Sequence, residues 1–175
     1  MTPIAGPAVT DPATATPRII VGIGEVGVAA DRATIVTHAL GSCVAVCAWD
    51  AMARVGGLLH FLLPEGRIHP ERALEQPAAF ADCGVPLLLH SLESAGARRD
   101  RCRVYLIGGA ETDVESAAPL LRVGRRNVQA ACRVLRRHGL LIQAAEVGGR
   151  RARTVHLDVS SGAIVVTSGV HSQEL

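Results

Sequence analysis

Two runs decide the fold class of this chain, C-V-A-V-C-A-W at residues 43–49 and V-G-G-L-L-H-F-L-L at residues 55–63. Both are short stretches of apolar and β-branched residues, and only a few residues separate them. Runs of this length and composition are typical of buried β-strands. We therefore expect two consecutive strands here, one containing Cys43 and the other His60.

Outward from these strands, the same β-type pattern recurs along most of the chain. Further strands are predicted at residues 18–23, 33–37, 103–107, 140–147, 154–159 and 163–167. A Ser-Ser-Gly turn is expected to join the last two of them. The segment P-E-G-R-I-H-P after residue 63 predicts a loop.

Two segments have helical character. One helix is predicted from Pro86 to Ala95, or from Ala78 with Pro86 as a kink. The other is predicted over residues 125–138, where Val128, Cys132 and Leu135 share an apolar face. Mixed β-sheets flanked by two main helices form an α/β or α+β sandwich, which is the fold class that we expect.

The first 17 residues differ in composition from the rest. They hold four of the nine prolines and little that a core could bury, so we expect a disordered tail at residues 1–17 and a single folded domain at residues 18–175. This N-terminus lacks the basic and apolar regions of a secretory signal, and the chain has no apolar run long enough to cross a membrane. Five cysteines without framework spacing suit a reducing compartment, so a cytoplasmic location is expected.

Composition excludes several classes of function. All 18 basic residues are arginine, and without lysine there is no Walker P-loop, pyridoxal-phosphate Schiff base or kinase-type phosphate lysine. The net charge of +2 and the 2% aromatic content do not indicate a nucleic-acid or membrane partner. Metal-binding spacings such as C-x-x-C and H-E-x-x-H are missing from the sequence, so we expect no metal and no cofactor.

Two arginine clusters, at residues 98–103 and 150–153, are typical of solvated faces, with an acidic partner as the alternative.

One stretch of the sequence indicates a different function, the binding of a dinucleotide. G-I-G-E-V-G at residues 22–27 matches the dinucleotide-binding pattern G-x-G-x-x-G after a strand, and Asp50 is placed where a ribose-binding acid would follow. The following residues include T-I-V-T and break at Gly41-Ser42, which is poor for the helix that this pattern requires. A glycine-punctuated strand and turn is the other interpretation.

Cys43 and His60 are the candidate nucleophile and base. Taken alone, this spacing fits a buried, unreactive cysteine and an ordinary histidine better than it fits a catalytic pair. Gly41-Ser42 lets backbone approach a substrate and can direct amide N–H groups at an oxyanion. Thr37 can hydrogen-bond an imidazole and fix its tautomer, and Gly56-Gly57 clears space on the strand of His60.

The stretches T-H-A-L-G-S-C-V-A-V and G-G-L-L-H-F-L-L-P resemble the signature of the CheD family of chemoreceptor glutamine deamidases. The likeness continues through I-I-V-G-I-G-E, I-G-G-A, V-G-R-R-N-V and E-V-G-G-R-R-A-R, and so covers essentially residues 18–167 in the family's order. The resemblance implies a fold similar to the catalytic domain of cytotoxic necrotizing factor toxins. It also implies partners, namely the cytoplasmic region of methyl-accepting chemoreceptors as substrate and a CheC phosphatase.

By this resemblance, Cys43, His60 and Thr37 form a catalytic triad that hydrolyses the side-chain amide of glutamine through a thioester. Backbone N–H groups at Gly41 and Ser42 would hold the oxyanion, and His60 is expected to lower the pKa of the Cys43 thiol.

The chain departs from the family pattern at His38, at Phe61-Leu62 and at Glu111-Thr112-Asp113, where the acidic segment bears on partner contacts. A binding module that docks receptors or the phosphatase without deamidation is the alternative function.

Overall fold

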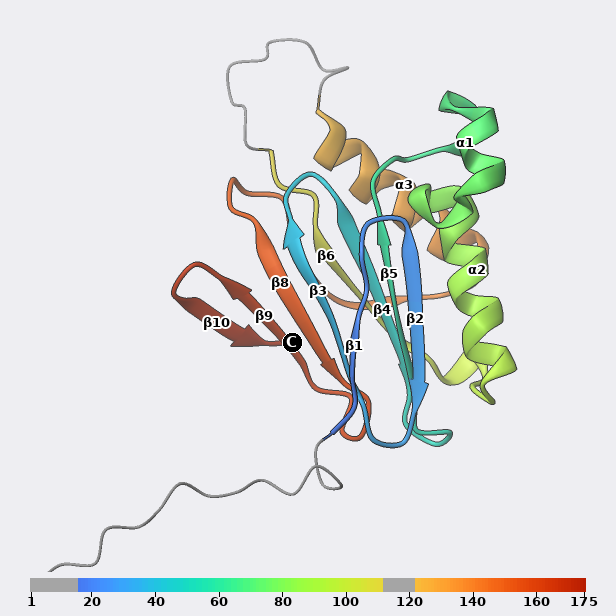
Figure 1. The fold of residues 1–175 in the computed structure, drawn as a ribbon, viewed down its shortest axis with the longest axis vertical. Helices are drawn as coiled ribbons and strands as arrows, with labels where there is room; N and C mark the ends of the chain where they lie inside the picture. Colours follow the sequence, from blue (N-terminus) through green and yellow to red (C-terminus); the bar gives the residue numbers. More distant parts are fainter. Residues whose placement is uncertain (1–15, 112–121) are drawn as a thin grey trace, which may run out of the picture.

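Two five-stranded sheets lie face to face, and helices cover the far side of one of them (Figure 1). The computed structural model describes residues 16–111 and 122–175. Most of the predicted tail and residues Thr112 and Asp113 fall outside these ranges. Mixed sheets with flanking helices confirm the expected α+β class.

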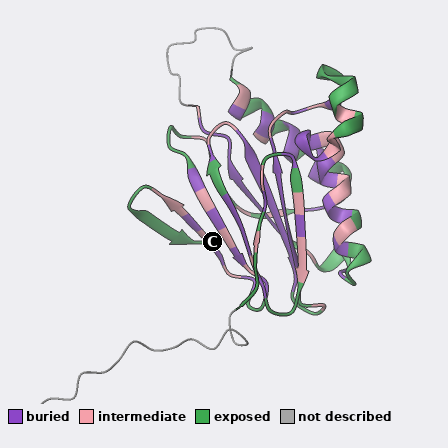
Figure 2. Ribbon diagram, in the orientation of Figure 1, coloured by how far each residue is buried: buried purple, intermediate pink, exposed green. Residues whose placement is uncertain are grey.

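The central sheet carries the two strands on which the sequence analysis began. Its order is β2-β5-β4-β6-β7, with bounds Glu25–Ala30, Val55–Phe61, Val44–Asp50, Arg103–Gly108 and Ile142–Val147. Every residue of β4 and β5 is buried, because the second sheet covers one face and the helices cover the other (Figure 2). Burial on both faces explains why these strands are continuous apolar runs instead of alternating ones.

The second sheet has one open face. Its order is β1-β3-β8-β9-β10, with bounds Arg18–Ile20, Thr34–Leu40, Arg153–Asp158, Ile164–Ser168 and His171–Glu174. Along β8, buried residues alternate with half-buried ones, as expected for a strand covered on a single side. The pairs β1–β3 and β6–β7 are parallel and the other pairs are antiparallel, so both sheets are mixed.

Two long helices pack on the central sheet, and shorter helical segments connect them to it. The helices are α1 (Pro70–Glu75), α2 (Ala81–Ser94) and α3 (Val123–Arg137), and the short 3₁₀ segments are η1 (Gly66–Ile68), η2 (Pro77–Ala79) and η3 (Arg99–Arg101). Helix α2 begins at Ala81, well before Pro86. This agrees with the predicted start near Ala78 and not with a start at Pro86. The short helix α1 follows the predicted loop and was not predicted; it buries no residue, so no apolar periodicity marks it.

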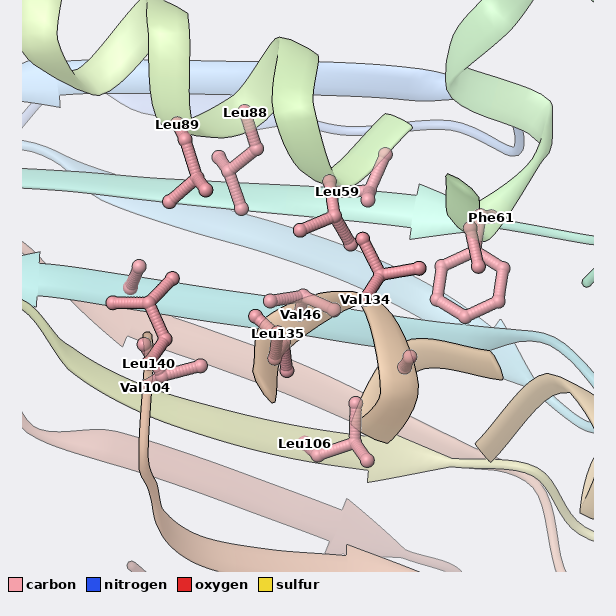
Figure 3. Packing of buried hydrophobic residues seen from close by; sticks show 14 of the residues in the cluster. Val46, Leu59, Phe61, Leu88, Leu89, Val104, Leu106, Val134, Leu135 and Leu140 are labelled. Atoms are coloured by element: carbon pink, nitrogen blue, oxygen red, sulfur yellow. The ribbon is translucent and has the colours of Figure 1, made fainter. Parts of the chain in front are cut away.

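The core has two parts, one on each side of the central sheet. Leucines and valines of β4–β6 and of helices α2 and α3 fill the space between sheet and helices, including Leu59, Leu88 and Leu135 (Figure 3). Ile35, Leu58, Ile107 and Leu157 are among the residues between the two sheets. Because the chain has so few aromatic residues, aliphatic side chains supply nearly all of both clusters.

Several sequence interpretations prove wrong. The G-I-G-E-V-G stretch forms the turn between β1 and β2 and the first residues of β2, so the dinucleotide-binding helix is wrong and the strand-and-turn interpretation is confirmed. Cys132 is exposed, because α3 buries the small residues Ala130 and Ala131 against the sheet instead. Arg153 is not on a solvated face: it is buried and ion-paired with Glu146 at 2.8 Å.

Candidate active site

Cys43, His60 and Thr37 come from three different elements and meet between the two sheets. Cys43 immediately precedes β4, His60 is the penultimate residue of β5, and Thr37 lies in β3 of the other sheet. The exposed fraction is 7% for Cys43, 1% for His60 and zero for Thr37. Of the three, only the cysteine keeps some access to solvent.

Strand register places Cys43 and His60 on the same face of the central sheet, as diagonal neighbours. Ala45 pairs directly with His60 across β4 and β5. Cys43 lies two residues before Ala45, so it occupies the same face of the sheet and is the diagonal neighbour of His60. Diagonal pairs of this kind have Cα atoms about 7–8 Å apart, within reach of a thiol and an imidazole that point toward one another.

Thr37 determines which nitrogen of His60 carries the proton. The Thr37 hydroxyl lies 2.7 Å from the carbonyl oxygen of Val21 and 2.7 Å from His60 Nδ1. A carbonyl only accepts, so the single hydroxyl proton goes to Val21 and the hydroxyl oxygen must accept from Nδ1–H. His60 is therefore the Nδ1–H tautomer, and its Nε2 carries the lone pair.

His60 Nε2 is the free end of this chain of hydrogen bonds. In the part of the chain that the structure describes, Nε2 is buried and has no hydrogen-bond partner. A buried, unpaired acceptor is unfavourable and is typical of functional sites. This nitrogen is thus available to take a proton from the neighbouring thiol.

Burial sets the charge state of the pair. It lowers the pKa of His60 to about 4, and it raises the pKa of the Cys43 thiol, which a hydrogen bond from its own backbone N–H lowers in part. The expectation that His60 holds the thiol pKa down is not met in this unliganded site. Cys43 and His60 are a neutral pair at neutral pH, so proton transfer must accompany attack on a substrate.

Glu25 is a charged group that acts on His60 in the opposite direction. It pairs directly with His60 across β2 and β5, and its Oε2 accepts the Gly22 N–H at 2.8 Å. The negative carboxylate raises the pKa of His60 against the effect of burial. The sequence analysis included Glu25 in two glycine-containing motifs but gave it no role of its own.

The turn before the nucleophile is held by three hydrogen bonds to successive carbonyls. Gly41 O accepts from Ala110 N at 2.7 Å, and Cys43 O accepts from Gly109 N at 2.7 Å. Ser42 O accepts from the side chain of Asn127 at 2.9 Å. In a trans peptide the N–H points away from the C=O, so the amides of Ser42 and Cys43 are directed away from these donors.

Gly41 and the glycine pair of β5 differ from the sequence expectation. The Gly41 N–H donates to Ala39 O at 2.8 Å, so this amide is already engaged within the turn. Gly56 and Gly57 do not clear space for a substrate. A Cβ at Gly56 would lie 3.1 Å from Val159, and a Cβ at Gly57 would lie 2.9 Å from Leu88, so these glycines admit the other sheet and helix α2.

Asn127 was missed as a residue of the site. It is the fully buried polar residue of α3 and it contacts the nucleophile turn. The only signal in the sequence was an asparagine placed at helical spacing on the face that also carries Ala130, Ala131 and Val134.

The described ranges contain no group of three or more histidine, cysteine, aspartate or glutamate side chains able to hold a metal ion. None of the helices in these ranges is long and apolar enough to cross a membrane.

Comparison with known proteins identifies the relatives of this chain. The family described as CheD chemotactic sensory transduction matches residues 62–168. A protein of Anaeromyxobacter dehalogenans named probable chemoreceptor glutamine deamidase CheD 2 is 47% identical over 86% of this chain and 94% of its own length. The chemoreceptor glutamine deamidase CheD of Thermotoga maritima is 36% identical over 84% of this chain and 89% of its own.

This chain belongs to the CheD family. The probable chemoreceptor glutamine deamidase CheD of Pyrococcus abyssi is also 40% identical over 85% of this chain and 90% of its own length. The range of the family match begins two residues after His60. The roles of Cys43, His60 and Thr37 are therefore argued from their geometry.

Proposed function

We propose that this CheD protein is a protein-glutamine deamidase, which converts glutamines in the cytoplasmic region of methyl-accepting chemoreceptors to glutamate. The names of its relatives support the reaction and the substrate class. The observation that carries the mechanism is the Thr37–His60 hydrogen bond of 2.7 Å, since it leaves a lone pair on Nε2 beside Cys43.

In the proposed first step, the Cys43 sulfur attacks the carboxamide carbon of the glutamine side chain while its proton moves to His60 Nε2. The amides of Ser42 and Cys43 stabilise the oxyanion of the tetrahedral intermediate. Gly41 keeps the approach open, because a Cβ at this position would meet no atom within 4 Å.

Collapse of the intermediate breaks the carbon–nitrogen bond. His60 returns its proton to the departing nitrogen, which leaves as ammonia, and an acyl thioester remains on Cys43. A water molecule then attacks the thioester with His60 Nε2 as the base. Glutamate is released and the thiol regains its proton, so the enzyme is unchanged and the net reaction consumes one water.

The test is ammonia release from purified receptor cytoplasmic fragments, with mass spectrometry to locate each new glutamate. Cys43→Ala and His60→Ala are expected to abolish both signals.

Thr37→Val removes the acceptor of Nδ1–H and is expected to lower kcat by about 10–100-fold, since the imidazole loses its fixed tautomer. Cys47→Ala is the matched control, because Cys47 is buried on the same face of β4 and lies outside the site. Full activity in Cys43→Ala would contradict the proposal.

A second candidate is a binding module that docks receptors without modifying them. The raised pKa of the buried Cys43 thiol favours it, since the resting thiol is a weak nucleophile. Receptor binding that persists in a wild-type chain releasing no ammonia would support this candidate.

Three finer statements belong to the same proposal. A CheC-type phosphatase is proposed as a further partner, and the cytoplasm as the location. A fold similar to the catalytic domain of cytotoxic necrotizing factor toxins is proposed from the family resemblance and from the mixed sheets with flanking helices.

A further inference from the structure

Asn127 joins the two halves of the site. One hydrogen of its side-chain amide goes to Ser42 O at 2.9 Å, and the other goes to Leu62 O at 2.8 Å. Both partners are carbonyls, which only accept, so the orientation of the amide is unambiguous. Ser42 directly precedes the nucleophile, and Leu62 lies two residues after the base. A single buried side chain thus spans from the cysteine turn to the histidine strand.

We propose that Asn127 is a positioning residue that fixes the Cys43 amide as an oxyanion donor and holds the nucleophile turn at a set distance from His60. This inference rests on the proposed deamidase function.

The peptide plane between Ser42 and Cys43 carries the argument. Asn127 holds the carbonyl of this peptide from the side of α3. The N–H of the same trans peptide therefore points away from α3, toward the thiol side of the turn. In agreement, the Cys43 N–H contacts its own sulfur closely enough to lower the thiol pKa. An amide beside the attacking sulfur is placed where the oxyanion forms.

The second hydrogen bond acts on the strand of the base. Leu62 is held from both sides, since its carbonyl accepts from Asn127 and its N–H donates to Ala79 O at 3.0 Å. The end of β5, which carries His60, is thereby fixed relative to the turn that carries Cys43.

Close packing of α3 makes this reach possible. A Cβ at Gly124 would lie only 2.5 Å from Gly109 O and 2.6 Å from Ala110 O, so the first turn of the helix lies directly on this segment. Gly109 and Ala110 themselves donate to the carbonyls of Cys43 and Gly41. The helix and the β6 end therefore support the nucleophile turn together.

The chemistry of the side chain argues against a purely structural role. Among the described residues, Asn127 Oδ1 is buried without a hydrogen-bond partner. An apolar residue would avoid this unsatisfied oxygen but would leave the carbonyls of Ser42 and Leu62 without their donor, so the side chain is suited to holding these two carbonyls and not to packing alone.

Two variants of Asn127 and one control test the proposal in the full-length protein. Asn127→Leu removes both donors at similar volume, and Asn127→Ser keeps one shorter donor. Val134→Ala is the control, because Val134 is buried two turns further along the same face of α3 and does not contact the nucleophile turn. The readouts are kcat and KM for a receptor cytoplasmic fragment, with the melting temperature of each variant.

Asn127→Leu is expected to lower kcat by about 10–100-fold, the scale of a misplaced oxyanion donor, and to change KM by less than about threefold. Asn127→Ser is expected to fall between it and the wild type. Val134→Ala is expected to lower the melting temperature but to keep kcat within about twofold.

Wild-type kcat in a folded Asn127→Leu overturns the proposal, and if that variant does not fold, Asn127→Ser decides in the same way. Equal loss of kcat in Val134→Ala also overturns it, because stability alone would then explain the effect. A wild-type chain that releases no ammonia overturns the deamidase function itself, and this inference with it.

Discussion

At the scale of single residues, the site depends on where each proton is held. The Thr37 hydroxyl donates its hydrogen bond to the carbonyl of Val21. The Thr37 oxygen is therefore left to accept a hydrogen bond from His60 Nδ1–H. Each step follows from the number of donors and acceptors on the groups involved. Burial keeps the resting pair neutral, and Glu25 is the nearby charge that favours the protonated imidazole.

Glu25→Gln tests this electrostatic contribution. The amide keeps an oxygen for the Gly22 N–H but removes the negative charge opposite His60, so the pKa of His60 should fall below its value of about 4. A lower pKa keeps the base neutral to lower pH, which moves the acid limb of the kcat/KM profile in the acidic direction. Titration of the His60 ring protons by NMR checks the pKa directly.

Glu75→Gln is the matched control for Glu25→Gln, since Glu75 lies on α1 near the Gly24–Glu25 turn but is not paired with His60 in the sheet. An equal shift in both variants would show a general effect of net charge and contradict the specific pairing.

At the scale of elements, backbone contacts bring α3 to the nucleophile turn. Gly124 is the residue that permits this contact, because its missing side chain leaves room for the carbonyls of Gly109 and Ala110. Asn127, three residues later, can then reach the carbonyl of Ser42. In β3, a register shift between Thr37 and Leu40, with Ala39 at a φ of 56°, ends the regular pairing just before the turn.

Gly124→Ala is expected to destabilise the protein by about 2–3 kcal/mol, near the upper end for overpacking, because the obstructing atoms are backbone and cannot rotate away. It is also expected to lower kcat, since α3 would carry Asn127 away from Ser42. Urea unfolding and steady-state deamidation measure the two effects. Gln129→Ala, an exposed change on the same helix, should alter stability by less than about 0.5 kcal/mol; a Gly124→Ala protein as stable as the wild type would contradict the close contact.

At the scale of the whole molecule, one buried carboxylate binds segments that are far apart in the chain and makes stability depend on pH. Asp50 is fully buried at the end of β4 and accepts from the backbone N–H groups of Met52 and Arg98 and from the Arg101 guanidinium at 2.7 Å. These hydrogen bonds oppose the effect of burial and lower the pKa of Asp50. The residue once considered for ribose binding is thus a structural anchor between the β4–β5 turn and the segment before β6.

Asp50→Asn tests this link between charge and stability. A carboxyl with a folded-state pKa below its unfolded value stabilises the protein above the unfolded pKa, near 4, and loses that contribution as pH falls through the folded pKa. Asp50→Asn should lower the free energy of unfolding at neutral pH by about 2–4 kcal/mol and flatten its decline in acid. Urea unfolding from neutral to acidic pH checks both. Asp31→Asn is the control, since the Asp31 side chain is 75% exposed, and an equal loss in that variant would refute the role of Asp50.

The strands were the part of the fold that the sequence predicted best. Apolar runs mark β4 and β5 because both faces of these strands are buried. Strands β2 and β10 were missed because half of β2 is glycine and alanine and all of β10 is exposed, so neither shows a clear apolar pattern. Cys132 was misplaced because the buried face of α3 consists of Gly124, Asn127, Ala130, Ala131, Val134 and Leu135 and leaves Cys132 exposed.

By itself, the sequence determined the α+β class, the central strands and the choice of Cys43, His60 and Thr37 as candidates, because these depend on local patterns and on motifs read along the chain. Only the tertiary structure decided the tautomer of His60, the neutral state of the thiol and the contacts of Glu25 and Asn127. Those properties arise between elements far apart in the chain, where strand register, burial and the direction of each peptide plane fix which donor meets which acceptor.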